Sequence, residues 1–208
     1  MDVSCIILAG GKSTRLGRNK PWERIGSKSL LERAVSILSF LRSEIIIVTA
    51  KDSALPPINN YSRIRIINDI IPGKGSMGGI YTGLQASRSF FNLVVACDMP
   101  FLNKELISYM ISLTGAYDAV VPRSGEKAFE PLHAIYSKNC LPSIENLIQQ
   151  NRLSILELLQ LVKARYVIDA EIDKYDPKHL SFFNINTESD LQTVLKMVGK
   201  EDFWIDKC

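Results

Sequence analysis

The sequence predicts an α/β protein: a single-domain, three-layer α/β/α sandwich around a mainly parallel, Rossmann-like sheet. Two observations predict it. Short apolar runs alternate with amphipathic segments along the 208 residues, and this alternation with short connections is typical of α/β layers. The apolar runs are also nearly continuous, as expected of strands buried on both faces of a parallel sheet. We expect the domain to span residues 1–199, followed by a polar tail at 200–208.

The first half of the chain supplies most of the predicted sheet. A helix over 29–41 has an apolar stripe at helical spacing and opens with a capping box of Ser29 and Glu32. Four glycines within residues 72–79 predict a loop that leads into a helix near 80–87. The strands expected in this half cover residues 3–9, 44–50, 63–67, 92–97 and 117–122, and a further amphipathic helix covers 104–113.

In the second half the alternation is less regular. Ser154 and Glu157 form a second capping-box pattern, which predicts a short helix. Thr187 is the expected N-cap of a closing helix over 187–198. The remaining elements expected here are strands over 130–136, 164–169 and 181–185, and a helix over 141–150.

Composition narrows the class of protein. The chain has 25 basic and 22 acidic residues, a net charge of +3, which is too balanced to indicate a nucleic-acid partner. The four cysteines, Cys5, Cys97, Cys140 and Cys208, fit neither a zinc site nor a disulfide framework. The first apolar run is too short for a signal peptide or a membrane span. We expect a cytoplasmic protein with reduced thiols and no membrane partner.

A glycine loop follows the first strand and reads "LAGGKSTRLGRNK" from Leu8 to Lys20. The letters "GKS" look like the end of a Walker A loop, but that motif requires a glycine where this chain has Ile6. The spacing of G-x-G-x-x-G also fails. The loop therefore matches neither common nucleotide-binding fingerprint.

The physical properties of this loop still favour an anion site. Two glycines after a buried strand let the backbone approach a ligand closely. Lys12, Arg15, Arg18 and Lys20 place four positive side chains within nine residues, and both residue types bind phosphate. The alternative is a tight turn with solvated charges.

Two carboxylates are expected at the same edge of the sheet. Asp98 directly follows a buried strand, and nucleotide-bound Mg²⁺ typically takes one or two protein carboxylates. Asp69 follows the strand over 63–67; each could instead be a turn or cap residue. His133 is expected to be a packed strand residue and His179 a surface residue, so a hydrolase triad has little support.

The segments "LAGGKSTRLGRNK", "GSMGGIYTGL", "ACDMPFL", "EPLHAIY" and "FFNINTESDL" occur in this order. Together they resemble the molybdenum cofactor guanylyltransferase family, a branch of the nucleotidyltransferases. The resemblance runs from about Ile6 to Leu191. It implies a nucleotidyltransferase-type fold, GTP and molybdopterin (or molybdenum cofactor) as substrates, Mg²⁺ as cofactor, and molybdoenzymes or their chaperones as recipients.

The resemblance also implies residue roles. Arg15, Lys20 and Asp98 would be catalytic, with Asp98 as the Mg²⁺ ligand and the two cations on the triphosphate. Asn184 and Asn186 match the family's N-x-N-T segment near the pterin. The other substrate-binding positions would be Leu8, Ala9, Gly10, Gly11, Lys20, Asp69, Gly78 and Gly79.

Two departures keep alternatives open. Asn19 stands where the family often has Asp, and Val48-Thr49 stands where many members have Asn. A cytidylyltransferase, or another small nucleotidyltransferase acting on a phosphorylated metabolite, therefore stays open. So does a non-catalytic nucleotide-binding subunit, which would bind nucleotide without releasing pyrophosphate.

Overall fold

A computed structural model describes residues 2–10, 20–51, 53–58, 63–125 and 128–200 of the chain. The helices over the described residues are α1 (Leu30–Leu38), α2 (Gly75–Ala86), α3 (Lys104–Ser112), α4 (Leu141–Gln149), α5 (Ile155–Leu161), α6 (Asp169–Ile172) and α7 (Glu188–Lys200). The short 3₁₀ helices are η1 (Lys20–Trp22), η2 (Ser39–Leu41), η3 (Lys138–Cys140) and η4 (Leu180–Phe182).

A central sheet of eight strands has the order β10-β7-β9-β6-β1-β4-β5, with β8 paired to β7. Its strands are β1 (Val3–Leu8), β4 (Ile45–Thr49), β5 (Ile64–Asn68), β6 (Phe91–Ala96), β7 (Ala119–Ser124), β8 (Ala128–Phe129), β9 (His133–Ser137) and β10 (Ala164–Ile168). β1 pairs in parallel with both β4 and β6. β9 is antiparallel to β6 and β7. The prediction of a mainly parallel sheet is confirmed.

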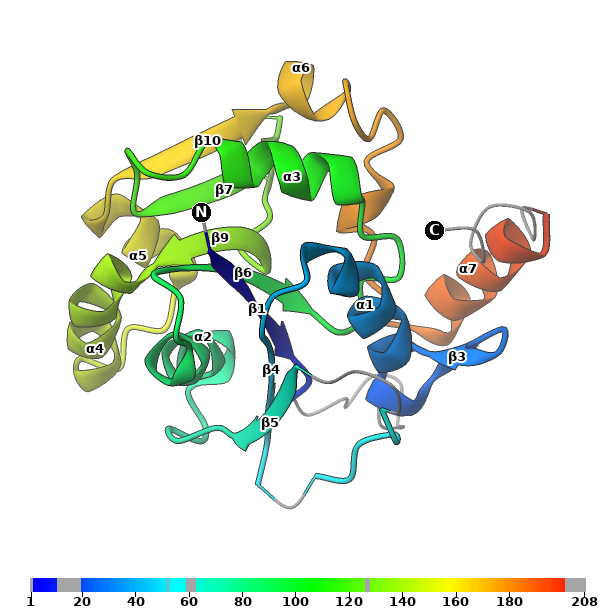
Figure 1. Ribbon diagram of the computed structural model, residues 1–208, viewed down its shortest axis with the longest axis horizontal. Helices are drawn as coiled ribbons and strands as arrows, with labels where there is room; N and C mark the ends of the chain where they lie inside the picture. Colours follow the sequence, from blue (N-terminus) through cyan, green and yellow to red (C-terminus); the bar gives the residue numbers. More distant parts are fainter. Residues whose placement is uncertain (1, 11–19, 52, 59–62, 126–127, 201–208) are drawn as a thin grey trace.

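Helices cover both faces of the sheet, as expected for three layers (Figure 1). Ile7 and Ile47 point to the face covered by α1 and α3, whereas Ile6 and Ile46 point to the face covered by α2, α4 and α5. Successive strand residues face opposite sides of a sheet. The continuous apolar runs are therefore needed because each strand packs against helices on both sides.

The loop predicted over residues 72–79 is shorter than expected, because α2 already begins at Gly75. Three helical glycines lie against the sheet or its loops instead. A Cβ on Gly79 would lie 3.0 Å from Leu8 Cδ2, and one on Gly78 would lie 2.9 Å from the carbonyl oxygen of Ile71. The glycines therefore allow α2 to approach the sheet closely.

One further strand prediction is wrong, and one predicted capping box is absent although the short helix that it predicts is present as α5. Residues 181–185 form no strand: η4 ends at Phe182, and the following residues pack through Phe183 and Ile185 into an apolar cluster. Ser154 precedes α5 but makes no side-chain cap hydrogen bond. The capping box of Ser29 and Glu32 at α1 is confirmed, with both reciprocal hydrogen bonds present.

A small third cluster lies outside the sandwich, where α7 packs beside the hairpin of β2 (Arg24–Ile25) and β3 (Lys28–Ser29) (Figure 1). Its buried residues include Ile25, Ile185 and Val194.

α7, the last helix described, runs through Lys200. The predicted tail from 200 onward falls almost wholly on residues 201–208, which lie outside the described residues, so it stays a prediction.

Cys5, Cys97 and Cys140 are buried free thiols, in agreement with the expectation of reduced cysteines; Cys208 lies outside the described residues. Burial raises the pKa of each of the three thiols to about 12. They are therefore protonated, unreactive packing groups at neutral pH.

Over the residues described, the chain has no helix that is long and apolar enough to span a membrane.

We expect Gly83→Ala to destabilise the fold. A Cβ at Gly83 would lie 2.5 Å from Cγ2 of the fully buried Ile6. Overpacking of this kind typically costs about 1–3 kcal/mol, which outweighs the gain of about 1 kcal/mol for alanine in a helix. Urea unfolding measures the difference. Gln85→Ala, on the exposed side of the same helix, should leave the midpoint nearly unchanged; an equal effect of both variants would contradict the packing argument.

Candidate functional site

The carboxyl ends of β1, β4 and β6 meet at one edge of the sheet, where the glycine loop begins. The amide of Ala9 donates to the carbonyl of Val48 at 2.8 Å, and the amide of Cys97 donates to the carbonyl of Leu8 at 3.2 Å. Leu8 and Ala9 are buried by these contacts, whereas Gly10 is exposed. Of the three predicted backbone contacts, Gly10 is therefore the one presented to solvent.

Gly10 also packs tightly on the neighbouring strand. A Cβ there would lie 3.1 Å from the backbone nitrogen of Ala50. The glycine is needed for close approach of the two chain segments. Gly11 and Arg15, together with Lys12, Ser13 and Arg18, lie outside the described residues, so their predicted roles stay predictions.

Three predicted site residues that are far apart in the sequence meet at the ammonium group of Lys20. Lys20 Nζ lies 2.7 Å from Asp98 Oδ2 and donates to Asn186 Oδ1 at 2.8 Å. The side chains of Lys20 and Asp98 are 18% and 15% exposed, so the pair is largely shielded but open on one side. We call these three residues the Lys20 cluster.

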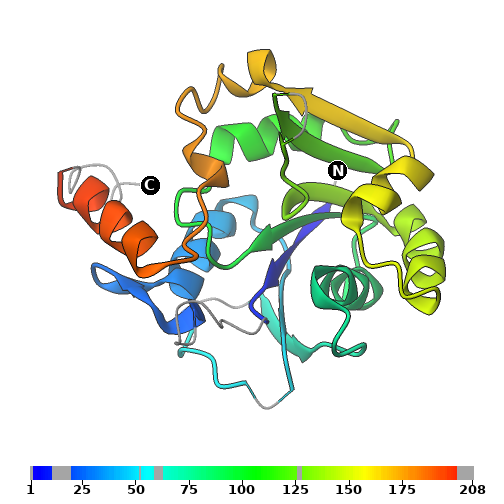
Figure 2. The ribbon, with the colours of Figure 1, turned by 180° about the vertical axis from the view of Figure 1, so that it is seen from behind.

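The backbone around Asp98 fixes the third member of this cluster. The amide of Ile185 donates to the carbonyl of Asp98 at 3.0 Å. Figure 2 shows the orange segment that leads into α7 passing beside the green loop after β6. Because Ile185 is fully buried, this contact holds its neighbour Asn186 close to the carboxylate of Asp98.

The carboxylate of Asp98 has one free acceptor. Its Oδ1 is buried and, among the described residues, has no hydrogen-bond partner. An unpartnered carboxylate oxygen beside a cation suits a divalent metal that also binds phosphate oxygens, since Mg²⁺ commonly takes few protein carboxylates. No cluster of three or more metal-ligating side chains occurs over the described residues, so any such metal would need most of its ligands from substrate and water.

Asp69 serves the local structure. Its Oδ1 accepts from the amide of Ile71 at 3.0 Å and from Thr82 Oγ1 at 2.8 Å. These bonds tie the loop after β5 to α2. Gly78 lies against this loop, where its Cβ would be 3.3 Å from Asp69 Oδ2. The structure therefore brings Asp69, on the loop after β5, beside the start of α2, which carries Gly78 and Gly79; no hydrogen bond or ion pair described here joins these residues to the Lys20 cluster.

The N-x-N-T segment is held by its own helix. Asn184 Nδ2 donates to the carbonyl of Phe182 at 2.9 Å. The amides of Asn186 and Thr187 both donate to Asp190 Oδ2, and these bonds, led by the Asn186 amide, lower the pKa of Asp190. The amide of Asp190 donates to Thr187 Oγ1 at 3.2 Å, which confirms Thr187 as the cap of α7.

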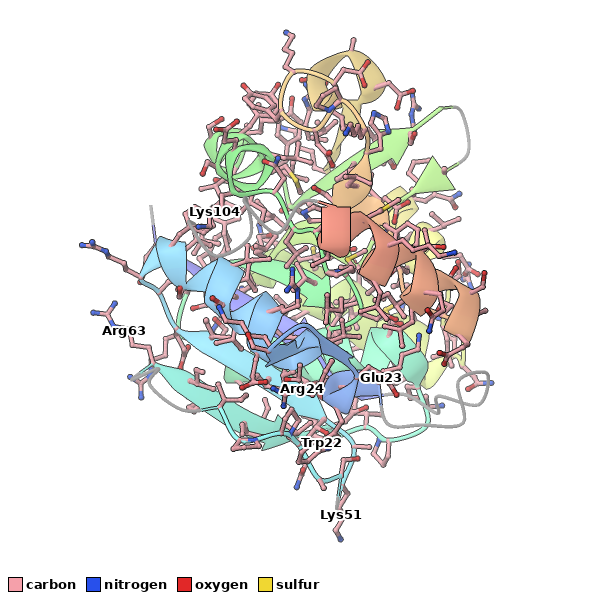
Figure 3. The ribbon with its side chains drawn as sticks, turned by 90° about the vertical axis from the view of Figure 1, so that its right-hand side faces the viewer. Trp22, Glu23, Arg24, Lys51, Arg63 and Lys104 are labelled. Carbon is pink, nitrogen blue, oxygen red and sulfur yellow. The ribbon has the colours of Figure 1, made fainter. Side chains whose placement is uncertain are left out.

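Two further residues at this edge have features that the sequence pattern did not single out. Thr49 ends β4, is 3% exposed, and its Oγ1 has no partner among the described residues. Trp22 is 42% exposed and donates from Nε1 to the carbonyl of Ala54 at 3.0 Å; Figure 3 shows it near Lys51. The position of Thr49 at a strand end could have been recognised from the sequence. The position of Trp22 could not, because it is set by a contact with the distant loop that contains Ala54.

The two histidines lie away from the Lys20 cluster. His133 is fully buried and packs on the ring of Phe182, with 5.2 Å between ring centroids, so its predicted packed role is confirmed. His179 Nε2 lies 2.8 Å from Asp173 Oδ1, and its Nδ1 lies 3.3 Å from Ser124 Oγ. His179 is only partly exposed, rather than a simple surface residue.

This arrangement is suited to nucleotidyl transfer. A glycine loop follows β1, the Lys20 cluster pairs a cation with a carboxylate, and both lie at the carboxyl edge of a parallel sheet, where ligands bind in open α/β folds. Fold and site together define a nucleotidyltransferase. The sequence profile of the MobA-like NTP transferase domain matches residues 5–165, and the chain belongs to that family.

Related sequences agree over nearly the whole chain. A protein of Pelotomaculum thermopropionicum, named "Probable molybdenum cofactor guanylyltransferase", is 35% identical over 193 residues, which cover 92% of this chain and 91% of the relative. A protein of the same name from Methanosarcina mazei is 35% identical over 200 residues, covering 92% and 89%.

Solved structures share the fold. The molybdopterin-guanine dinucleotide biosynthesis protein A of Archaeoglobus fulgidus superposes with a TM-score of 0.80 at 26% identity, over 95% of this chain and all of that one. The 4-diphosphocytidyl-2C-methyl-D-erythritol synthase of Anaerococcus prevotii gives 0.73 at 17% identity, over 95% and 98%. The second likeness shows the fold alone.

His133 should make stability depend on pH. Burial lowers the pKa of His133 from 6.5 to about 4. Between these values the unfolded chain binds the extra proton, so the free energy of unfolding falls as pH drops from 6.5 to 4. The shift corresponds to about 3 kcal/mol. Urea unfolding across this range measures the slope.

The matched variant is His133→Gln, which keeps a polar side chain that does not titrate. Subtracting its unfolding curve from that of the wild type removes the contribution of the carboxylates. We expect the wild type to lose more stability than the variant as pH falls from 6.5 to 4. Parallel curves for the two proteins would show that His133 has the same pKa in the folded and unfolded states, which would contradict the prediction.

Proposed function

We propose that this protein transfers GMP from GTP to the terminal phosphate of molybdopterin, giving the guanine dinucleotide form of the cofactor and pyrophosphate. The observation that carries the proposal is the Lys20 cluster, in which one ammonium lies within 2.8 Å of both Asp98 and Asn186. The residues that we propose for phosphate, metal and pterin binding are thus adjacent. The names of the relatives at 35% identity support the same reaction.

Among the described residues of the loop after β1, Lys20 is the cation that would meet the triphosphate. In the described state it is paired with Asp98, and substrate phosphate oxygens offer it a stronger partner because they carry more charge. The Lys20 side chain would then move from Asp98 to the phosphates. Arg15 would add a bidentate contact on the pyrophosphate side. Gly10 and Gly11 would leave room for the nucleotide beside the backbone.

Asp98 would hold the metal ion of the reaction, for which we propose Mg²⁺. The unpartnered Oδ1 of Asp98 is the acceptor available to it. When bound, such an ion neutralises charge that develops on phosphate oxygens. Departure of Lys20 towards the substrate would also free Oδ2, so the two roles of this pair depend on each other.

The chemistry needs positioning more than proton transfer. An oxygen of the molybdopterin phosphate attacks the α-phosphorus of GTP, the bond from that phosphorus to the bridging oxygen breaks, and pyrophosphate leaves with the electron pair. The attacking phosphate is already ionised at neutral pH, so no general base is required. Burial of His133, with its lowered pKa, is consistent with this. Alignment of the reactants and charge stabilisation supply the catalysis.

The nucleotide base would lie near α2 and the loop after β5. Asp69 fixes that loop through Ile71 and Thr82. Gly78 and Gly79 carry no side chains, so the surface of α2 at these positions is formed by backbone. Thr49 places an unpartnered hydroxyl at the adjacent strand end. The finished cofactor would pass to molybdoenzymes or their chaperones. We propose that these steps take place in the cytoplasm, without nucleic acid or membrane.

Replacing Asp98 or Lys20 should abolish transfer while the fold survives. We expect Asp98→Asn to lower kcat/KM by about 100-fold or more, as when one transition-state contact is removed. Lys20→Met should lower kcat/KM comparably. Pyrophosphate release with GTP, Mg²⁺ and molybdopterin measures both, and thermal melting checks the fold.

The matched control is Glu145→Gln, which removes an exposed carboxylate on α4 and should keep full activity. Wild-type turnover in Asp98→Asn would remove that carboxylate from the mechanism. Nucleotide binding without any pyrophosphate release in the wild type would instead favour a non-catalytic subunit.

The base preference can be tested by calorimetry with the four nucleoside triphosphates. We expect GTP in the presence of Mg²⁺ to bind most tightly, because the proposed reaction uses GTP. Thr49→Asn restores the residue type that many family members carry, and it should retain or strengthen this preference. Tighter binding of CTP than of GTP by the wild type would replace the guanylyl assignment with a cytidylyl one.

A further inference from the structure

A cavity lies on the face of the sheet that α1 and α3 cover, apart from the Lys20 cluster. It encloses about 470 Å³ between α1, the segment from Pro100 to the first turn of α3, and the chain just before η4. We call it the α1–α3 groove. Its apolar lining comes from Ile37, Pro100, Phe101, Leu102 and Leu180. This size and a mainly apolar wall are typical of small-molecule sites.

Charged groups surround this apolar wall. Lys28, Arg33 and Lys104 line the groove, and Arg33 is 94% buried, so a permanent cation lies within the protein at this position. In Figure 3 Lys104 projects where α3 comes close to α1. Lys28 Nζ donates to Ser36 Oγ at 3.2 Å, which holds its ammonium along the side of α1.

Two carboxylates also line the groove, but one is already engaged. Asp176 accepts from the amide of Leu180 at 3.1 Å and from that of Ser181 at 2.8 Å, so its charge is directed to the backbone. Glu105 is exposed in the first turn of α3. Arg33 is also engaged, since its Nη1 donates to the carbonyl of Ile25 at 3.5 Å. The ammonium groups of Lys28 and Lys104, against the one solvated carboxylate of Glu105, make the groove favourable for a negatively charged ligand.

The groove is separate from the Lys20 cluster, since it shares no lining residue with it. It is nevertheless connected to it through the chain. The lining segment starts at Pro100, two residues after Asp98, and Leu180 lies on the segment that leads to Asn184. Phe101 also packs on Phe183, with ring centroids 6.3 Å apart. An occupant of the groove would thus contact both segments that support the cluster.

We propose that the α1–α3 groove is a binding site for a small organic anion with an apolar, ring-sized body, distinct from the nucleotide site. The apolar wall takes the body, and Lys28 and Lys104 meet the negative group. The proposal follows from the groove alone and does not depend on which nucleotide or acceptor the enzyme uses.

The test uses anilinonaphthalene sulfonate, an aromatic anion whose fluorescence rises in apolar surroundings. We expect saturable binding of one dye per folded chain, unaffected by saturating GTP with Mg²⁺. Lys28→Glu and Lys104→Glu should each weaken binding about tenfold, because a charge-assisted contact is lost and a like charge is added. Lys104 is the first residue of α3, where a negative charge is favourable, so Lys104→Glu should fold.

Lys196→Glu, an equal charge change at an exposed position on α7, is the matched control and should bind the dye like the wild type. Cooperative urea unfolding confirms that each variant is native. Displacement of the dye by GTP would place it in the nucleotide site and overturn the proposal. So would equal affinities in all variants, the absence of saturation, or dye binding that is lost as protein concentration rises, which would indicate a second copy of the chain on the groove.

Discussion

The parallel pairing of β1 between β4 and β6 is the constraint on which the rest of the molecule depends. It brings the carboxyl ends of three strands to one edge, so the glycine loop, Thr49 and Asp98 start from neighbouring positions. It also buries both faces of each strand, which requires a layer of helices on either side. The same arrangement places α2 so close that glycine is required at Gly79 and Gly83. The parallel pairing of β1 with β4 and β6 therefore determines both the position of the site and the packing of the core.

The Lys20 cluster has a place in the stability of the fold as well as in the proposed function. Its ion pair is mostly shielded, and a shielded pair costs desolvation that only good geometry offsets. Asn186 supplies that geometry by accepting a second hydrogen bond from the same ammonium. A ligand with phosphate groups competes for the same cation. If Lys20 turned to such a ligand, the carboxylate of Asp98 would lose its partner, so a second cation would have to take the place of Lys20.

Much of this was predictable from the sequence because strand burial and strand ends are local patterns. The layers, most elements, and the position of Asp98 at the same edge as the glycine loop followed from apolar runs and what comes directly after them. The roles of Asp98 and Lys20 were implied by the family resemblance and stay predictions. The errors arose where tertiary contacts override local preference. Gly78 and Gly79 resemble loop residues, but they lie in α2 and are needed for its close contact with Ile71 and Leu8. The strand expected at 181–185 fails because its aromatic residues pack against His133 and Phe101 rather than a neighbouring strand.

The contact between Lys20 and Asn186 joins residues 166 positions apart, and this has a consequence for the order of assembly. β1 cannot complete its pairing until β6 has been synthesised, and contacts of such long range are made slowly because a large loop must close first. The last member of the cluster arrives only with the segment that leads into α7. During synthesis on the ribosome β1, β4, β5 and β6 can therefore pair before the segment that carries Asn186 has been made, and the Lys20 cluster is completed only after this part of the sheet.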